Sequence, residues 1–298
     1  MGLRHDVLMV GIVRENLLQD TQQNLILSTL PILDLDHPGA NDPDYRRRRD
    51  EIVTKAITFH TTGPSQRVVP LIEYTSKENE VWHHVSQKLS TLHEKWACSL
   101  YKEGRKIINL PTDRVPQLRD LNRELMRISG FQLEPIHGLV SAREFMMKLG
   151  EGIMLCTQYI RHHSKPEFSP EPDIIHEVFG HVPMFVHPKI IALNRLIGQA
   201  ARTATEEQLL WLNRLYWYSI EYGLIMEQGE MKAFGAGLLG GIKDCTNAFS
   251  GNCVIKPFTI QEVIKTDYNY SFEQPHFFVI PSLEWLHTEI ENFIKSFT

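Results

Sequence analysis

Apolar residues spaced three and four positions apart run through much of the chain, and this spacing predicts amphipathic helices. The longest such pattern covers residues 80–104. Thr75 and Glu78 have the spacing of a capping box ahead of it, and Gly104 is a suitable end. One long helix is therefore expected here. Its apolar stripe consists of Trp82, Val85, Leu89, Leu92, Trp96 and Leu100.

A second, more apolar pattern predicts a helix from about 206 to 228. Thr203 and Glu206 have the capping-box spacing at its start, and Gly229 follows its end. Glu221 lies inside this segment with only apolar or aromatic residues three and four positions away, so its carboxylate is expected to be buried. These neighbours are Trp217, Tyr218, Leu224 and Ile225.

Shorter elements complete the predicted fold. Helical patterns cover 116–130, 141–150 and 281–298, and runs of strand-forming residues cover 7–13, 67–74, 152–160, 253–260 and 276–280. The loop composition of 34–44 separates an N-terminal strand or arm, residues 1–33, from a main body, residues 34–298. The mixture predicts an α+β fold, in which a single, mostly α-helical domain carries a few short strands.

Charge and cysteine content narrow the classes of function. The 31 basic and 36 acidic residues give a formal net charge of -5, which argues against nucleic acid or an anionic membrane as a partner. The four cysteines lack CxxC spacing, which is typical of reduced thiols. No run of 18 apolar residues and no N-terminal cleavage signal is visible. The protein is therefore expected to be soluble and cytoplasmic.

The segment "HEVFGH" carries the first candidate chemistry. Its histidines, His176 and His181, lie five positions apart, one more than in the zinc protease motif. Residues five apart in a regular helix differ in direction by roughly 140°. The two imidazoles can converge only through a local π-bulge or at the end of the helix, and Gly180 is where the backbone could loosen.

The buried Glu221 has two explanations at this point, because an isolated buried carboxylate must neutralise, pair or bind a metal. One is an arginine partner; Arg214 shares its helix face but lies about two turns away. The other is a metal site completed by His176 and His181. Two imidazoles and one carboxylate serve non-haem Fe(II) oxygenases and zinc hydrolases alike.

The remaining histidines show no comparable arrangement. The adjacent pairs His83–His84 and His162–His163 are expected to point in different directions, as neighbours do in a helix or a strand. They are interpreted as surface or hydrogen-bonding residues and not as ligands.

Three runs of the chain closely resemble the catalytic domain of the pterin-dependent aromatic amino acid hydroxylases, which are the phenylalanine, tyrosine and tryptophan hydroxylases. They are "CTQYIRHHSKPEFSPEPDIIHEVFGHVPMF", "LYWYSIEYGL" and "KAFGAGLLGG". Further similar segments are 36–52, 115–125, 130–145 and 273–282. The regulatory domain and tetramerisation helix of the animal enzymes have no counterpart, so a free-standing catalytic domain that is a monomer or dimer is expected.

The resemblance implies roles for particular residues. His176, His181 and Glu221 match the iron ligands, and Glu177 matches an acid that contacts the pterin through water. The other implied pterin contacts are the stacking ring of Phe145, the backbone of Leu139 and Val140, and Tyr216 near the iron.

The resemblance also implies a pocket for the amino acid substrate. Arg161 matches the arginine that pairs with the substrate carboxylate, a role for which a guanidinium fork is suited. The other implied pocket residues are Ser169, Pro172, Asp173, Trp217, Gly237 and Tyr270. Two features depart from the family. Gly240 and Gly241 replace a serine pair that supports a ligand histidine, and Tyr270 stands where the animal enzymes vary a residue that affects substrate preference.

The implied activity needs Fe(II), a tetrahydropterin and O2, and hydroxylates the ring of an aromatic amino acid. Phenylalanine is the expected substrate, which makes the chain a phenylalanine 4-monooxygenase. Tryptophan hydroxylation, or a broad specificity for phenylalanine, tryptophan and tyrosine, is the alternative. A zinc hydrolase and a non-enzymatic pterin or amino acid binding protein are the remaining hypotheses.

Overall fold

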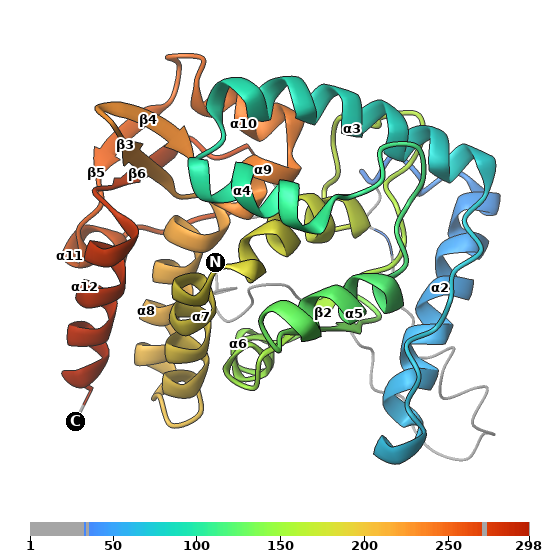
Figure 1. Ribbon diagram of the computed structural model, residues 1–298, viewed down its shortest axis with the longest axis horizontal. Helices are drawn as coiled ribbons and strands as arrows, with labels where there is room; N and C mark the ends of the chain where they lie inside the picture. Colours follow the sequence, from blue (N-terminus) through green and yellow to red (C-terminus); the bar gives the residue numbers. More distant parts are fainter. Residues whose placement is uncertain (1–32, 34–35, 270–272, 298) are drawn as a thin grey trace.

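The computed structural model describes residues 33, 36–269 and 273–297 (Figure 1). The strand expected over 7–13, nearly all of the arm expected over 1–33, and Tyr270 lie outside the described residues. Within them the fold is α+β and mostly helical, as the sequence predicts. No described helix is long and apolar enough to cross a membrane.

Helices supply most of the framework. In Figure 1, α3 runs along one side of the molecule with α2 at its end, and α7, α8 and α12 lie beside one another. The helices are α2 (Pro43–Thr61), α3 (Ser76–Trp96), α4 (Ser99–Ile108), α5 (Leu118–Ile128), α6 (Ala142–Gly150), α7 (Pro188–Ala201), α8 (Glu206–Tyr216), α9 (Ala236–Gly240), α10 (Ile242–Ala248), α11 (Ile260–Val263) and α12 (Leu283–Lys295).

The strands of the described residues form two small sheets. β1 (Gln132–Pro135) pairs in parallel with β2 (Ile153–Cys156). The other sheet has the order β4-β3-β6-β5, in which β3–β4 is antiparallel and β3–β6 and β5–β6 are parallel. Its strands are β3 (Leu224–Glu227), β4 (Glu230–Ala233), β5 (Val254–Pro257) and β6 (His276–Ile280). The strands expected within 152–160, 253–260 and 276–280 are confirmed, whereas 67–74 has no strand.

The prediction of one long helix that ends at Gly104 is wrong, because α3 ends at Trp96 and the chain leaves the helix at Ala97. The Ala97 backbone forms a parallel bridge with Ala233, and Cys98 N donates to Ala233 O at 3.0 Å. The helix restarts at Ser99, whose N–H donates to the Glu227 carboxylate. Gly104 lies within α4, where an added Cβ would come 1.9 Å from Pro183 O. It is a site of close approach and not a helix end.

The helix expected from 206 to 228 is shorter. The Thr205 side chain caps α8 in a box with Gln208, in place of the predicted Thr203 and Glu206, although the cap of α3 by Thr75 is as expected. After α8 comes a π-turn, Trp217–Glu221, and then β3. Gln228 and Gly229 have φ of 52° and 82°, the signature of a two-residue type I′ hairpin turn that joins β3 to β4.

A candidate metal centre and its pocket

A π-turn over His176–His181 resolves the five-residue spacing of the two histidines. A π-turn closes its hydrogen bonds over five residues, so residues i and i+5 share a face. The imidazole rings of His176 and His181 have their centroids 5.1 Å apart. The turn packs against α9, with Gly180 at the contact, where a Cβ would come 2.7 Å from Ala236 O. On its other side, Phe179 stacks on Trp82 with centroids 4.6 Å apart.

Glu221, at the end of the second π-turn, completes a cluster with these histidines. Its Oε1 lies 3.1 Å from His181 Nε2, and its Oε2 lies 3.5 Å from His176 Nε2. The three candidate ligand atoms lie within 4.8 Å of one another. Arg214, the partner that the alternative explanation offered, pairs with Asp267 instead. The carboxylate is therefore buried against two imidazoles.

The charge states of the cluster suit metal binding, which requires ionised carboxylate and neutral imidazole. Burial opposes ionisation of Glu221, but attraction to His181 and His176 outweighs it, so the pKa of Glu221 is lowered. Burial lowers the pKa of His176 to about 4, which leaves its ring neutral near pH 7. The donor set is that of an iron or zinc site with open coordination positions.

Glu177 lies next to the cluster in a different environment. Its Oε1 accepts from Thr157 N at 3.4 Å and from Thr157 Oγ1 at 3.3 Å. Burial, followed by the nearby charge of Glu221, raises the pKa of Glu177 well above its usual range. The raised pKa favours the protonated form of Glu177, which can donate a hydrogen bond, beside a Glu221 carboxylate whose pKa is lowered.

Arg161 is held in place by Asp173. Its Nε and Nη2 donate to the two carboxylate oxygens at 2.9 and 2.7 Å, and its backbone N also donates to Oδ2 at 2.7 Å. Burial of Asp173 is outweighed by this pairing, which lowers its pKa. His176 N donates to Oδ1 of the same carboxylate at 3.2 Å. Asp173 thus fixes both the guanidinium and the backbone of the first histidine.

A pocket of about 860 Å³ opens over the cluster. Ten of the residues predicted for the site line it: Phe145, Arg161, Ser169, Pro172, His176, Glu177, His181, Trp217, Glu221 and Gly237. Asp173 lies behind Arg161, and the buried Tyr216 contacts Phe145 edge-on with centroids 5.6 Å apart. Leu139 and Val140 precede Ser141, the cap of the helix that carries Phe145.

Two aromatic side chains and a serine shape the rim. Trp217 stacks on Tyr268 with centroids 4.2 Å apart and donates to Gln274 Oε1 at 3.2 Å. The hydroxyl of Ser169 donates to Glu171 O at 2.5 Å, within the loop that forms one lip of the pocket. A Cβ at Gly237 would come 2.5 Å from the Tyr222 ring, so glycine lets this ring lie against α9.

Other lining residues were missed by sequence reasoning, among them Met154, Glu167, Phe168, Pro170, Glu171, Tyr222 and Asp244. The proline-rich loop around 164–173 carried a composition signal for several of them. Asp244 carried none. Burial, followed by the nearby charge of Glu273, raises its pKa to about 6.

Gly240 packs its backbone directly on His176. An added Cβ would lie 2.9 Å from His176 Cα and 3.1 Å from His176 O. The serine that the resemblance leads one to expect would therefore need a shift of α9 away from the π-turn. Backbone contact with Gly240 and the hydrogen bond to Asp173 support His176 here.

Comparison with known proteins gives a consistent result. The sequence model of a family described as "Biopterin-dependent aromatic amino acid hydroxylase" matches residues 15–298, beginning ahead of the boundary expected at residue 34. A tyrosine 3-monooxygenase from Schistosoma mansoni is 37% identical over 93% of this chain and 60% of the relative. A phenylalanine-4-hydroxylase from Rattus norvegicus is 34% identical over 92% of this chain and 60% of the relative. The chain spans half to three fifths of the length of such curated relatives.

Solved structures with the same fold are also similar. The apo structure of the cold active phenylalanine hydroxylase from Colwellia psychrerythraea 34H has a TM-score of 0.70 and 28% identity, over 79% of this chain and 94% of that one. A phenylalanine hydroxylase from Chromobacterium violaceum has a TM-score of 0.71 and 27% identity, over 76% of this chain and 84% of that one. That structure has bound iron(III) and the oxidised cofactor 7,8-dihydrobiopterin.

Proposed function

Because this chain belongs to the biopterin-dependent aromatic amino acid hydroxylases, we propose that it is a non-haem Fe(II), tetrahydropterin-dependent monooxygenase that hydroxylates the ring of an aromatic amino acid. The observation that carries this proposal is the convergence of His176, His181 and Glu221 at the base of the pocket. The three side chains come from two separate π-turns, so tertiary structure and not local sequence brings them together.

The residues of the cluster fit an iron ion, because they offer two imidazoles and one carboxylate whose pKa is lowered. When bound, iron and tetrahydropterin would together supply the activation of O2 from which one oxygen atom reaches the substrate ring. His176, His181 and Glu221 would hold the metal and leave its remaining coordination positions facing the pocket.

The pterin position that we propose lies between Phe145 and Glu177. The Phe145 ring, packed against Tyr216, offers a fixed apolar face on which a flat bicyclic ring can stack. Burial raises the pKa of Glu177 and so favours its protonated carboxyl group, which can donate a hydrogen bond to water beside the pterin. The backbone of Leu139 and Val140, just before α6, would add hydrogen bonds to the pterin edge.

Arg161 would bind the carboxylate of the amino acid. Asp173 occupies Nε and Nη2, so the guanidinium is oriented before substrate arrives and Nη1 faces only Pro166 O at 3.4 Å. Ser169, Pro172, Trp217 and Gly237 would form the walls around the substrate. This enclosure excludes water from the reacting ring.

We propose phenylalanine as the preferred substrate, with tyrosine as the product. The two solved structures described above are phenylalanine hydroxylases, and both are matched over more than four fifths of their length. The curated relatives are named as tyrosine 3-monooxygenases as well as phenylalanine-4-hydroxylase, and the chain covers a smaller share of them. The solved structures therefore favour phenylalanine. Tyr270, which would bear on this preference, lies outside the described residues.

Turnover of each aromatic amino acid tests the proposal. The full chain is assayed with ferrous iron, tetrahydrobiopterin and O2, and tyrosine, dihydroxyphenylalanine and 5-hydroxytryptophan are measured by chromatography. Phenylalanine should give the highest kcat/KM. A higher kcat/KM for tyrosine or tryptophan would reassign the substrate, and activity that needs zinc but neither pterin nor O2 would indicate a hydrolase.

The Glu221→Ala variant tests the metal assignment in the same assay. Loss of the only carboxylate in the cluster should abolish both iron binding at the triad and hydroxylation. Glu230→Ala is the matched control, since Glu230 is exposed on β4 and pairs only with Lys232 at 2.7 Å. Iron content and turnover retained in Glu221→Ala would reject the triad as the metal site.

A further inference from the structure

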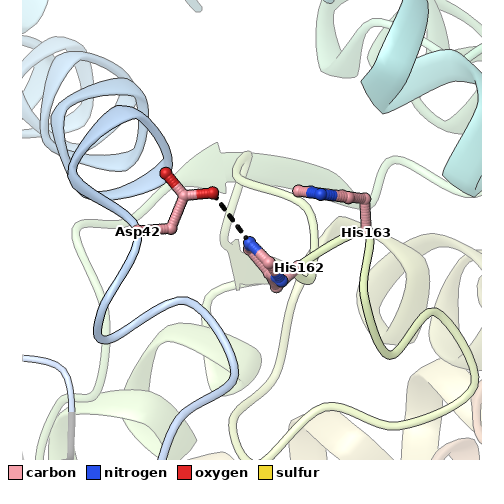
Figure 2. A group of neighbouring side chains, drawn as sticks. All are labelled: Asp42, His162 and His163. Carbon is pink, nitrogen blue, oxygen red and sulfur yellow. Dashed lines mark hydrogen bonds and ion pairs between the residues drawn. The ribbon is translucent and has the colours of Figure 1, made fainter.

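A second cluster of potential metal ligands lies away from the pocket. Among the described residues, Asp42, His162 and His163 form the other group whose ligand atoms all lie within 4.8 Å of one another. The sequence expectation that His162 and His163 point apart is wrong. Their ring centroids are 4.2 Å apart, because the chain is in neither a helix nor a strand at this point but enters a turn. Figure 2 shows both rings on the side that faces Asp42.

The carboxylate of Asp42 is fixed by the helix that it caps. Its Oδ1 accepts from Asp44 N at 2.9 Å and from Tyr45 N at 3.1 Å at the start of α2. Its other oxygen, Oδ2, lies 3.1 Å from His162 Nε2 (Figure 2). Because the cap uses one oxygen, the second can serve as a metal ligand without unwinding the helix.

The His162 ring is also held in place. It is buried, its edge contacts Tyr45 with centroids 5.0 Å apart, and its Nδ1 lies 2.7 Å from Ser164 Oγ. A serine hydroxyl can accept from Nδ1–H as well as donate to Nδ1. Ser164 N also donates to Nδ1, at 3.2 Å, so the ring carries its proton on Nε2 and donates it to Asp42 Oδ2. When a cation takes the place of that proton, Nε2 becomes the ligand atom and the proton moves to Nδ1, where the Ser164 hydroxyl can accept it. Imidazole ligands of metals usually have such a partner on their other nitrogen.

His163 supplies the third group. Its ring is exposed, and one of its nitrogen atoms lies within 4.8 Å of the candidate ligand atoms of the other two residues. Two imidazoles and a carboxylate form a donor set that prefers zinc and neighbouring divalent transition metals.

We propose that Asp42, His162 and His163 form a second metal site, distinct from the triad, that binds a divalent transition cation such as Zn²⁺. Two ligands each about 2.0–2.1 Å from a shared tetrahedral zinc ion are about 3.3 Å apart. The observed 3.1 Å between Asp42 Oδ2 and His162 Nε2 is close to this value. The ion replaces the proton of that hydrogen bond, and water completes the coordination.

The position of this site relates it to the substrate pocket. His162 directly follows Arg161, whose guanidinium lines the pocket. Asp42 is at the start of α2, about 120 residues earlier in the chain. A bound cation therefore fastens the first turn of α2 to the segment that carries Arg161, and it restrains that segment without touching the pocket.

Zinc stoichiometry tests the proposal on the full chain. The protein is freed of metal with a chelator and titrated with Zn²⁺ by calorimetry as wild type, His163→Ala, Glu221→Ala and the double variant. We expect two equivalents in the wild type, one in each single variant and none in the double variant. Only the triad remains in His163→Ala, so a triad that does not bind zinc would lower the stoichiometry of this variant to zero and leave that of Glu221→Ala at one. The two sites are therefore judged separately.

Asp42→Asn is the second variant, made in the Glu221→Ala chain so that only the proposed site remains. Asparagine is an equally good helix cap, so α2 is preserved while the charged ligand is lost. Zinc affinity should fall roughly tenfold or more, whereas His287→Ala, a histidine of α12 outside both clusters, should leave it unchanged. Unchanged zinc affinity in both His163→Ala and Asp42→Asn overturns the proposal.

Discussion

Buried charges in this molecule are mostly matched by a partner of opposite sign. Arg161 is paired with Asp173, Arg49 with Glu171, and Glu221 lies between two histidines. A buried charge that loses its partner is costly, which explains why these groups occur together. Glu177 and Asp244 are exceptions at the pocket, since the nearby charges of Glu221 and Glu273, respectively, add to the effect of burial.

Replacement of Asp244 by asparagine should therefore stabilise the protein above neutral pH. The pKa of Asp244 is raised to about 6 in the folded chain. Its contribution to the free energy of unfolding is therefore complete at pH values below its pKa in the unfolded chain, and it is lost as pH rises through about 6. The free energy of unfolding is measured by urea denaturation for Asp244→Asn and the wild type. The difference between the two proteins should be about 1–3 kcal/mol more favourable to the variant at pH 8 than at pH 3.5. A difference that does not depend on pH would contradict the burial of this charge.

The site residues that could be predicted from sequence are those with an ionisable side chain in an otherwise apolar segment, where burial of a charge is costly. Glu221 and the histidine pair stood out in this way, and the resemblance supplied Arg161 and Phe145. Asp244 and Tyr222 could not be found, because they reach the pocket only through the packing of α9 and α10. The mutual approach of His162 and His163 was hidden for a similar reason, since the direction of each ring is set by a turn that no sequence pattern predicts.

At the scale of elements, both candidate ligand segments are π-turns, His176–His181 and Trp217–Glu221. A π-turn is a rare and less favourable form of helix, so tertiary contacts must hold it. For the first turn those contacts are the backbone of α9 and the ring of Trp82. The site therefore depends on glycines that let α9 approach.

A methyl group at Gly180 should disturb this packing. Its carbon would come 2.7 Å from Ala236 O and 2.9 Å from Ala236 Cβ, so α9 or the π-turn must move. We expect Gly180→Ala to lower the free energy of unfolding by about 1–3 kcal/mol and to weaken iron binding. Denaturation and iron titration measure both effects.

Gly63→Ala is the matched control for this variant. Gly63 has an ordinary φ of -56° and no atom near the position of an added Cβ. It should change stability by less than about 1 kcal/mol, and in the stabilising direction. Equal effects of the two substitutions would show that packing against α9 is not what Gly180 provides.

Element boundaries were harder to predict than element types. The apolar stripe continues from Trp96 to Leu100 without a breaker, and only the pairing of Ala97 with Ala233 interrupts the helix. Likewise, β3 lies within the segment for which apolar periodicity favoured a helix, and it pairs with the distant β6. In both places, pairing between distant segments overrides local preference.

At the scale of the whole molecule, the proposed iron site joins segments that are 40 residues apart in sequence, at His181 and Glu221. A ligand that binds only the folded chain stabilises it by mass action. Under anaerobic conditions, ferrous iron at 100 times its Kd should add about 2.7 kcal/mol to the free energy of unfolding. A melting curve should show a rise of several degrees that a chelator reverses.

The Glu221→Ala variant is the control for that measurement. Its melting temperature should respond to iron much less than that of the wild type, because only the two histidines of the first π-turn remain at the triad, while the proposed second site is unchanged. An iron-dependent rise of equal size in this variant would place the stabilising ion elsewhere. The overall fold class was predictable because it depends on apolar patterns summed over many residues. The approach of Glu221 to His176 and His181 depends on a few contacts between distant segments.

The two π-turns also make the metal centre sensitive to the number of residues as well as to their identity. Deleting one residue between His176 and His181 would keep every candidate ligand in the sequence, and would restore the four-residue spacing that suits a regular helix. Each deleted residue rotates the remainder of a helix by roughly 100° about its axis. The position of His181, and of the chain leading into Val182–Val186, would change together. The segment His176–His181 should therefore tolerate insertions and deletions less well than substitutions of the residues between the two histidines.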